Sequence, residues 1–60
     1  MVIKTYPLLE KTERGWEVLV TITCRVVGEM CDGRKVWYCE ATDEQYFLYK
    51  IQGHYYFVHE

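Results

Sequence analysis

A regular alternation dominates the middle of the chain, in residues 16–27, which read WEVLVTITCRVV. The even-numbered side chains of this run, from Trp16 to Val26, are all apolar, while most of the odd-numbered ones are polar. A period of two is typical of a β-strand with one buried face, and neither Gly nor Pro interrupts the run. The pattern therefore predicts a long central strand whose even face supplies the core.

Residues 2–9, VIKTYPLL, predict a first strand. Pro7 lacks the backbone N–H that a strand ladder uses, which places it on a sheet edge or at a bulge. With Lys4 also present, we expect an edge that is protected against pairing with a partner strand. Residues 11–15 are charged and end in Gly15, which favours a short hairpin loop with the glycine in a left-handed conformation.

The dipeptide Asp32-Gly33 predicts a second hairpin after the central strand. A two-residue loop would place Arg25 opposite Glu40, whereas a four-residue loop over 30–33 would shift the pairing by two positions. Such a shift keeps every side chain on its own face. Either register therefore leaves the odd-numbered side chains of the following strand on the core face.

The C-terminal third favours a third hairpin over a helix. Residues 42–45 resemble a capping box that would open a short helix at about 43–52, giving an α+β fold as the alternative. Against this, QYFLYKI and HYYFV are aromatic-rich runs on either side of a Gly-containing turn, which is typical of a hairpin. A two-residue loop would oppose Tyr49 to Tyr56, and a three-residue loop would exchange the faces of the second run.

These segments predict one small all-β domain, residues 1–60, with about five antiparallel strands. A 12-residue strand spans about 40 Å, which exceeds the diameter of about 27 Å expected for a compact chain of this length. The central strand must therefore coil strongly, as in a small SH3-like barrel or meander, or else project into a partner. The resemblance to SH3-like barrels is one of architecture, and no family motif accompanies it.

Composition narrows the range of functions. Half of the 60 residues are apolar, and nine acidic against seven basic side chains give a net charge of −2. This balance argues against a phosphate-tracking surface and against a polybasic membrane patch. No apolar run approaches the length of a membrane span, and Pro7 and Glu10 interrupt any secretory signal. We expect a cytoplasmic protein that does not act at a membrane.

The chemistry-bearing side chains are few. The soft metal ligands are Cys24, Cys31, Cys39, His54 and His59, and no two cysteines lie closer than seven positions apart, so we expect no metal site and no disulfide framework. We predict that Cys24 and Cys39 are buried in the core and that Cys31 is exposed in a turn. The chain contains no serine, and a barrel this small offers little volume for a Cys–His site, so we predict no enzymatic activity and no cofactor.

The aromatic C-terminal hairpin is the best candidate for a binding surface, because tyrosine is enriched at interface hot spots. We predict a protein-binding face composed of Tyr46, Leu48, Lys50, Tyr55, Phe57 and His59. The alternatives are that these rings simply fill the core of a small protein, that they mediate homodimerisation, or that they stack on the bases of single-stranded nucleic acid. Net acidity weighs against nucleic acid.

The function we expect is that of a small intracellular binding module with a larger protein as its partner. Such a module would act as an adaptor or an inhibitor, of the kind that phages and mobile elements encode; this origin is a hypothesis. A single-stranded nucleic-acid-binding barrel and a homodimeric structural subunit are the two alternatives.

Overall fold

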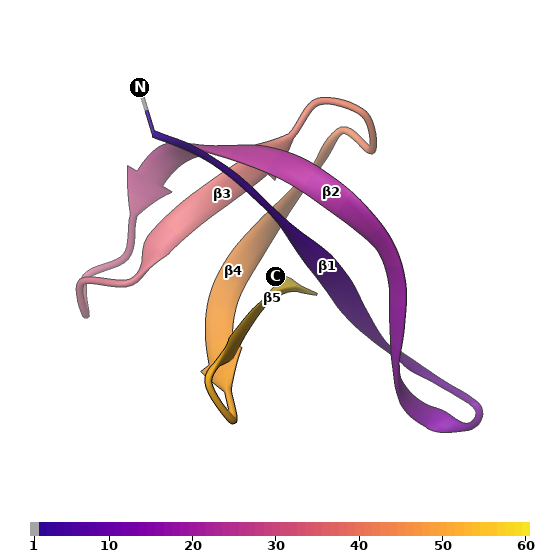
Figure 1. The fold of residues 1–60 in the computed structure, drawn as a ribbon. Helices are drawn as coiled ribbons and strands as arrows, with labels where there is room; N and C mark the ends of the chain where they lie inside the picture. The colour runs from indigo at the N-terminus through magenta and orange to yellow at the C-terminus, as the bar shows by residue number, and fades with distance from the viewer. Residues whose placement is uncertain (1) are drawn as a thin grey trace.

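A computed structural model describes residues 2–60, and in these residues the chain forms five strands and no helix (Figure 1). The strands are β1 (Ile3–Thr12), β2 (Gly15–Glu29), β3 (Lys35–Cys39), β4 (Glu44–Ile51) and β5 (His54–His59). Neighbours in sequence pair antiparallel, and β5 returns beside β1 in parallel, so the sheet closes into a barrel in the order β1-β2-β3-β4-β5. The predicted all-β fold is confirmed. The alternative helix at about 43–52 is wrong, because β4 occupies that segment.

The long strand β2 is the spine of the barrel. Fifteen residues would span about 50 Å if straight, yet the longest dimension of the molecule is 33 Å. The strand therefore curves, as Figure 1 shows, and it changes partner along its length. Residues 15–25 lie beside β1 and residues 25–29 lie beside β3. The predicted coiling of the central strand is confirmed.

The tight turns follow the predicted glycine chemistry. In the β4–β5 turn, Gln52 and Gly53 have φ angles of 49° and 83°, and Tyr49 lies opposite Tyr56. Two consecutive positive φ angles are typical of the type I′ hairpin turn, so the two-residue loop is confirmed and the three-residue alternative is wrong. Gly15 has a φ of 103° at the start of β2, as the charged loop before it predicts.

The β2–β3 connection is longer than either predicted loop. Arg25 lies opposite Tyr38, which is the pairing of the four-residue register, but a register shift between Val26 and Gly28 adds one residue to β2. The loop therefore covers residues 30–34. The cross-strand charge pair nevertheless forms, because Arg25 Nε reaches Glu40 Oε1 diagonally at 3.3 Å.

The core lies inside the ring of strands and is largely aromatic. Its buried side chains are Leu8, Ile22, Cys24, Trp37, Cys39, Tyr46 and Phe57. The Phe57 ring lies at the centre, with its centroid 5.6 Å from that of Trp37 and 6.4 Å from that of Tyr46. Cys24 and Cys39 are each 1% exposed, so their predicted burial is confirmed.

A bulge between β1 and β2 divides the even face of β2. Pro7 pairs with Thr21 and Leu9 pairs with Val18, so two residues of β2 lie across from the single residue Leu8. One extra residue exchanges the faces of the strand beyond it. Trp16 and Val18 are 58% and 55% exposed, and the prediction that they belong to the core is therefore wrong. The same holds for Val20 at the bulge, which is 64% exposed, whereas Ile22 is buried as predicted.

Residues 9–20 form what we call the projecting hairpin, the end of β1–β2 that extends beyond the other strands in Figure 1. β5 pairs with β1 only at Leu8 and Leu9, and β3 pairs with β2 only from Arg25 onward. No strand of the described chain therefore lies across the tip of this hairpin. Its apolar side chains remain at the surface for that reason.

Candidate binding surface

The structure places the central part of the predicted binding face of the C-terminal hairpin inside the barrel. Tyr46 and Phe57 are 1% and 0% exposed, and Leu48 packs partly buried against the core. The cause is barrel closure, because the pairing of Phe57 with Leu8 turns this face of β4 and β5 inward. The expectation that this face points outward is wrong, and the opposite face of the same hairpin is the exposed one.

Lys50, Tyr55 and His59, the other three residues of the predicted face, lie exposed at its ends. There they contact neighbouring side chains of the barrel. The Lys50 ammonium lies 5.5 Å from the centre of the Tyr55 ring, and His59 Nε2 lies 3.0 Å from Glu44 Oε2. The backbone carbonyl of Glu60 and the carboxylate of Glu44 both favour the imidazolium form, so they raise the pKa of His59. This face therefore brings together no continuous exposed aromatic surface.

The outer side of the barrel carries an apolar groove of about 330 Å³. Its lining comes from β1, β2, β4 and β5, namely Leu9, Trp16, Tyr49, Ile51 and Val58, which we call the groove surface. Trp16 is 58% exposed, and Tyr49 and Ile51 are 41% and 44% exposed. The groove thus lies where the projecting hairpin meets the outer face of the β4–β5 hairpin.

Charged groups border the groove surface at one end. An adjoining hollow shares Leu9, Trp16 and Val58 with the groove and adds Glu10, Lys11 and His59. An apolar centre with a polar, solvated rim is the usual anatomy of a protein–protein contact. Nothing in this lining supplies a nucleophile paired with a base.

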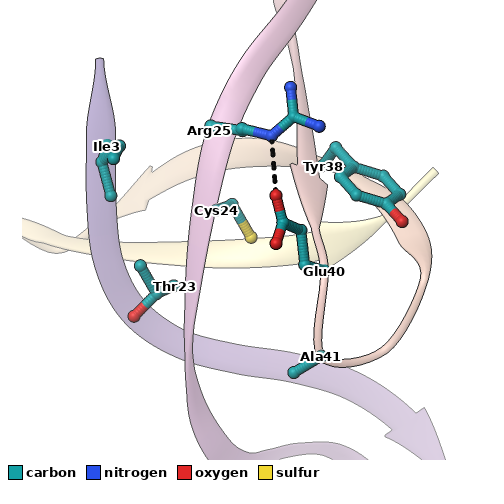
Figure 2. Close-up of a pocket in the computed structure, with 7 residues that line it drawn as sticks. All are labelled: Ile3, Thr23, Cys24, Arg25, Tyr38, Glu40 and Ala41. Atoms are coloured by element: carbon teal, nitrogen blue, oxygen red, sulfur yellow. Dashed lines mark hydrogen bonds and ion pairs between the residues drawn. The ribbon is translucent and has the colours of Figure 1, made fainter. Parts of the chain in front are cut away.

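A second hollow of about 340 Å³ lies over β2 and the end of β3. Figure 2 shows Arg25 and Glu40 facing each other across it, joined by their ion pair, and the Arg25 guanidinium also lies 5.2 Å from the centre of the Tyr38 ring. Burial raises the pKa of the Cys24 thiol to about 12, so this sulfur stays protonated at neutral pH and is a poor nucleophile. Its polar side chains already have partners, since Arg25 pairs with Glu40, and the hydroxyls of Thr23 and Tyr38 bond to Thr5 and Asp43 outside the hollow. We assign the hollow no ligand.

Among residues 2–60, no group of three His, Cys, Asp or Glu side chains lies close enough to hold a metal ion. Cys31 is exposed in the β2–β3 loop, as the sequence predicts. The described part of the chain contains no helix with the length and apolar character needed to cross a membrane.

Comparison with known proteins finds no family model, no curated protein and no solved structure that matches this chain. The fold and the surface chemistry are therefore the basis for the functional argument.

Sequence reasoning missed the groove surface, although one signal for it was present. Leu19 is apolar at an odd position and breaks the alternation of residues 16–27. Three successive apolar residues within an alternating strand are consistent with the bulge, which the structure places at Leu19 and Val20. Barrel closure brings Trp16 beside Ile51, which lies 35 positions later in the chain. No local sequence pattern encodes this contact.

Proposed function

We propose that this protein is a protein-binding module that acts as an adaptor or inhibitor by placing its groove surface against a larger partner. The observation that supports the proposal is the apolar groove with an exposed tryptophan at its side. Contiguous apolar patches on small proteins commonly mark interaction sites, and tryptophan and tyrosine are the residues most enriched at binding hot spots.

The groove surface suits a partner that presents an apolar anchor. An apolar side chain of the partner, inserted into the groove, can bury part of the Trp16 and Tyr49 rings on either side of it. Glu10 and Lys11 can contact polar groups of the partner at the rim. A small closed barrel suits such a role, because it holds side chains from distant parts of the chain in a fixed arrangement. We place this function in the cytoplasm, since three cysteines without a disulfide suit a reducing compartment.

The test is retention of a partner by the immobilised protein and by two variants, Trp16→Ala and Met30→Ala. Met30 is a matched control, because it is a 42% exposed apolar residue in the β2–β3 loop and does not line the groove. We expect Trp16→Ala to weaken binding of a retained partner by at least about 30-fold, and Met30→Ala to leave it unchanged. Equal retention by both folded variants would refute the groove surface as the site.

Fluorescence anisotropy with single-stranded DNA and RNA at low salt tests the nucleic-acid alternative. We expect no binding, because Lys11 and His59 stand against Glu10 at the rim, which is too little positive charge to neutralise a phosphate backbone. Binding that Trp16→Ala abolishes would assign the groove surface to base stacking instead of protein recognition.

A further inference from the structure

We infer that residues 16–22 of β2, which we call the free edge, pair antiparallel with the free edge of a second copy of this chain. The dimer would join two barrels through one continuous sheet across a two-fold axis. This inference does not rest on the proposed function, because it concerns the edge of a strand, whereas the groove lies on the face of the sheet.

Strand pairing leaves this edge open. Within residues 2–60, residues 16–22 have a strand neighbour on one side only, which is β1, because β3 begins to pair with β2 at Arg25. Figure 1 shows this part of β2 bending away from β3 and β4. An unpaired strand edge presents a row of backbone N–H and C=O groups that can template pairing with another strand.

The side chains of the free edge do little to prevent such pairing. Trp16, Val18, Leu19 and Val20 are all between 44% and 64% exposed. The one charged residue in 16–22 is Glu17, and its carboxylate accepts a hydrogen bond from the Thr12 hydroxyl on the adjacent strand. Natural proteins usually protect long edges with lysine or proline, and neither occurs in this segment.

The other open edge of the same hairpin shows the contrast. β1 pairs with β5 over only two residues, so much of its outer edge is also unpaired in the described chain. This edge carries Lys4, Pro7 and Lys11, which are the usual protective residues. β1 is thus protected where β2 is not, and this difference singles out β2 as the edge that pairs.

A second copy fits the free edge better than an unrelated strand for two reasons. Antiparallel pairing about a two-fold axis uses the same edge of both copies once, so the assembly closes at two and does not grow into a filament. The edge also carries exposed apolar side chains, and pairing of two copies would let the apolar side chains of each copy cover those of the other. We estimate that pairing would cover on the order of 600 Å² per copy, or about 1,200 Å² in total, which exceeds the total of about 1,000 Å² needed for a biological interface.

Since the two-fold axis would be perpendicular to the shared sheet, both groove surfaces would lie on the same side of the dimer. The dimer would therefore present its groove surface twice to one partner.

Sedimentation velocity from about 1 to about 500 µM, together with amide hydrogen exchange at both ends of that range, tests the inference. We expect the mass to double with rising concentration. Alternate amides in residues 16–22, those that point away from β1, should change from fast to slow exchange as the dimer forms, because only edge pairing gives them an acceptor.

The variant Val20→Lys introduces a charge into the free edge, and Met30→Lys is its matched control on the β2–β3 loop. We expect Val20→Lys to weaken the dimer at least about tenfold and Met30→Lys to leave it unchanged. A monomer throughout the concentration range would overturn the inference, as would a dimer that leaves exchange in residues 16–22 unaltered. If Val20→Lys does not fold, the amide exchange pattern of the unmodified chain decides whether the dimer forms through the free edge. Because Trp16 belongs to both the free edge and the groove surface, sedimentation of Trp16→Ala is measured beside its partner binding, which separates loss of the dimer from loss of the partner contact.

Discussion

The barrel body comprises residues 3–8 of β1, residues 22–29 of β2, β3, β4 and β5. It and the projecting hairpin both carry large apolar side chains, but only the body encloses a buried core. In the body, Phe57 and Tyr46 are almost inaccessible, whereas in the hairpin Trp16 and Val20 are more than half exposed. The difference lies in the strands around these side chains. The body is a closed ring of strands, whereas the hairpin consists of only two strands. Apolar content alone therefore does not predict burial; the number of elements packed against a segment decides it.

Replacing the central ring of the body should produce the largest effect. Phe57→Ala removes a fully buried side chain that packs against Tyr6, Trp37 and Tyr46. We expect a loss of about 3–5 kcal/mol, comparable to the whole stability of a domain of this size, so the variant should be unfolded at 25 °C by circular dichroism.

The matched change in the projecting hairpin is Trp16→Ala, which also replaces an aromatic ring. Because Trp16 is 58% exposed, we expect its loss to lower the free energy of unfolding in urea by less than about 1 kcal/mol. A loss as large as that of Phe57→Ala would mean that the hairpin is part of the core, and the contrast between the two regions would not hold.

Glycines in the turns of the two regions give an intermediate effect. Gly53 in the body and Gly15 in the hairpin have φ angles of 83° and 103°, so alanine is strained at both. We expect Gly53→Ala to lower the free energy of unfolding in urea by about 1 kcal/mol. Gly15→Ala should instead increase local amide exchange near Trp16, with a smaller change in global stability, because the hairpin tip can open by itself.

Gly28 provides the control for both turn substitutions. It lies in β2 without a positive φ, and a Cβ there would meet no atom within 4 Å. Gly28→Ala should therefore be neutral or slightly stabilising in urea. Equal global losses for Gly15→Ala and Gly53→Ala would show that hairpin and body unfold as one unit.

A pH titration should produce the smallest effect. The folded protein raises the pKa of His59 above its usual value of 6.5, because the Glu60 carbonyl and the carboxylates of Glu44 and Glu10 favour the charged ring. The protonated form therefore stabilises the fold. This contribution is fully present below pH 6.5 and is lost as the pH rises through the raised pKa.

We expect a small decrease in the urea midpoint across the neutral range, since the His59 side chain is 46% exposed. Glu44→Gln should flatten this dependence by removing the nearest carboxylate. A midpoint that rises with pH would contradict the assigned direction of the shift.

Much of the fold could be predicted because its signals are local. The alternation of residues 16–27, the glycine turns and the aromatic runs specify strands and tight turns through contacts between near neighbours. Cys24 and Cys39 could likewise be assigned to the core, because both lie on the apolar face of their strands. The capping-box pattern at 42–45 was overridden by the pairing of β4 with β3 and β5.

The candidate binding surface could not be predicted in the same way. In the C-terminal hairpin both faces are apolar, so pattern alone could not choose between Tyr46 with Phe57 and Tyr49 with Val58. In β2, one extra residue at Leu19 and Val20 sufficed to move Trp16 from the core to the surface. A period of two assigns the side of a strand only up to the first bulge.

The sequence by itself therefore determined the strands, the two tight turns and the part of the core that Ile22, Cys24, Trp37 and Cys39 form, since these depend on backbone preferences and on neighbours close in the chain. Only the tertiary structure decided which face of each hairpin is exposed, where the groove lies and which strand edge is left open. The physical reason is that these properties depend on the closure of the barrel between β1 and β5. That pairing brings Leu8 beside Phe57, 49 positions apart, and turns one apolar face inward and the other toward solvent.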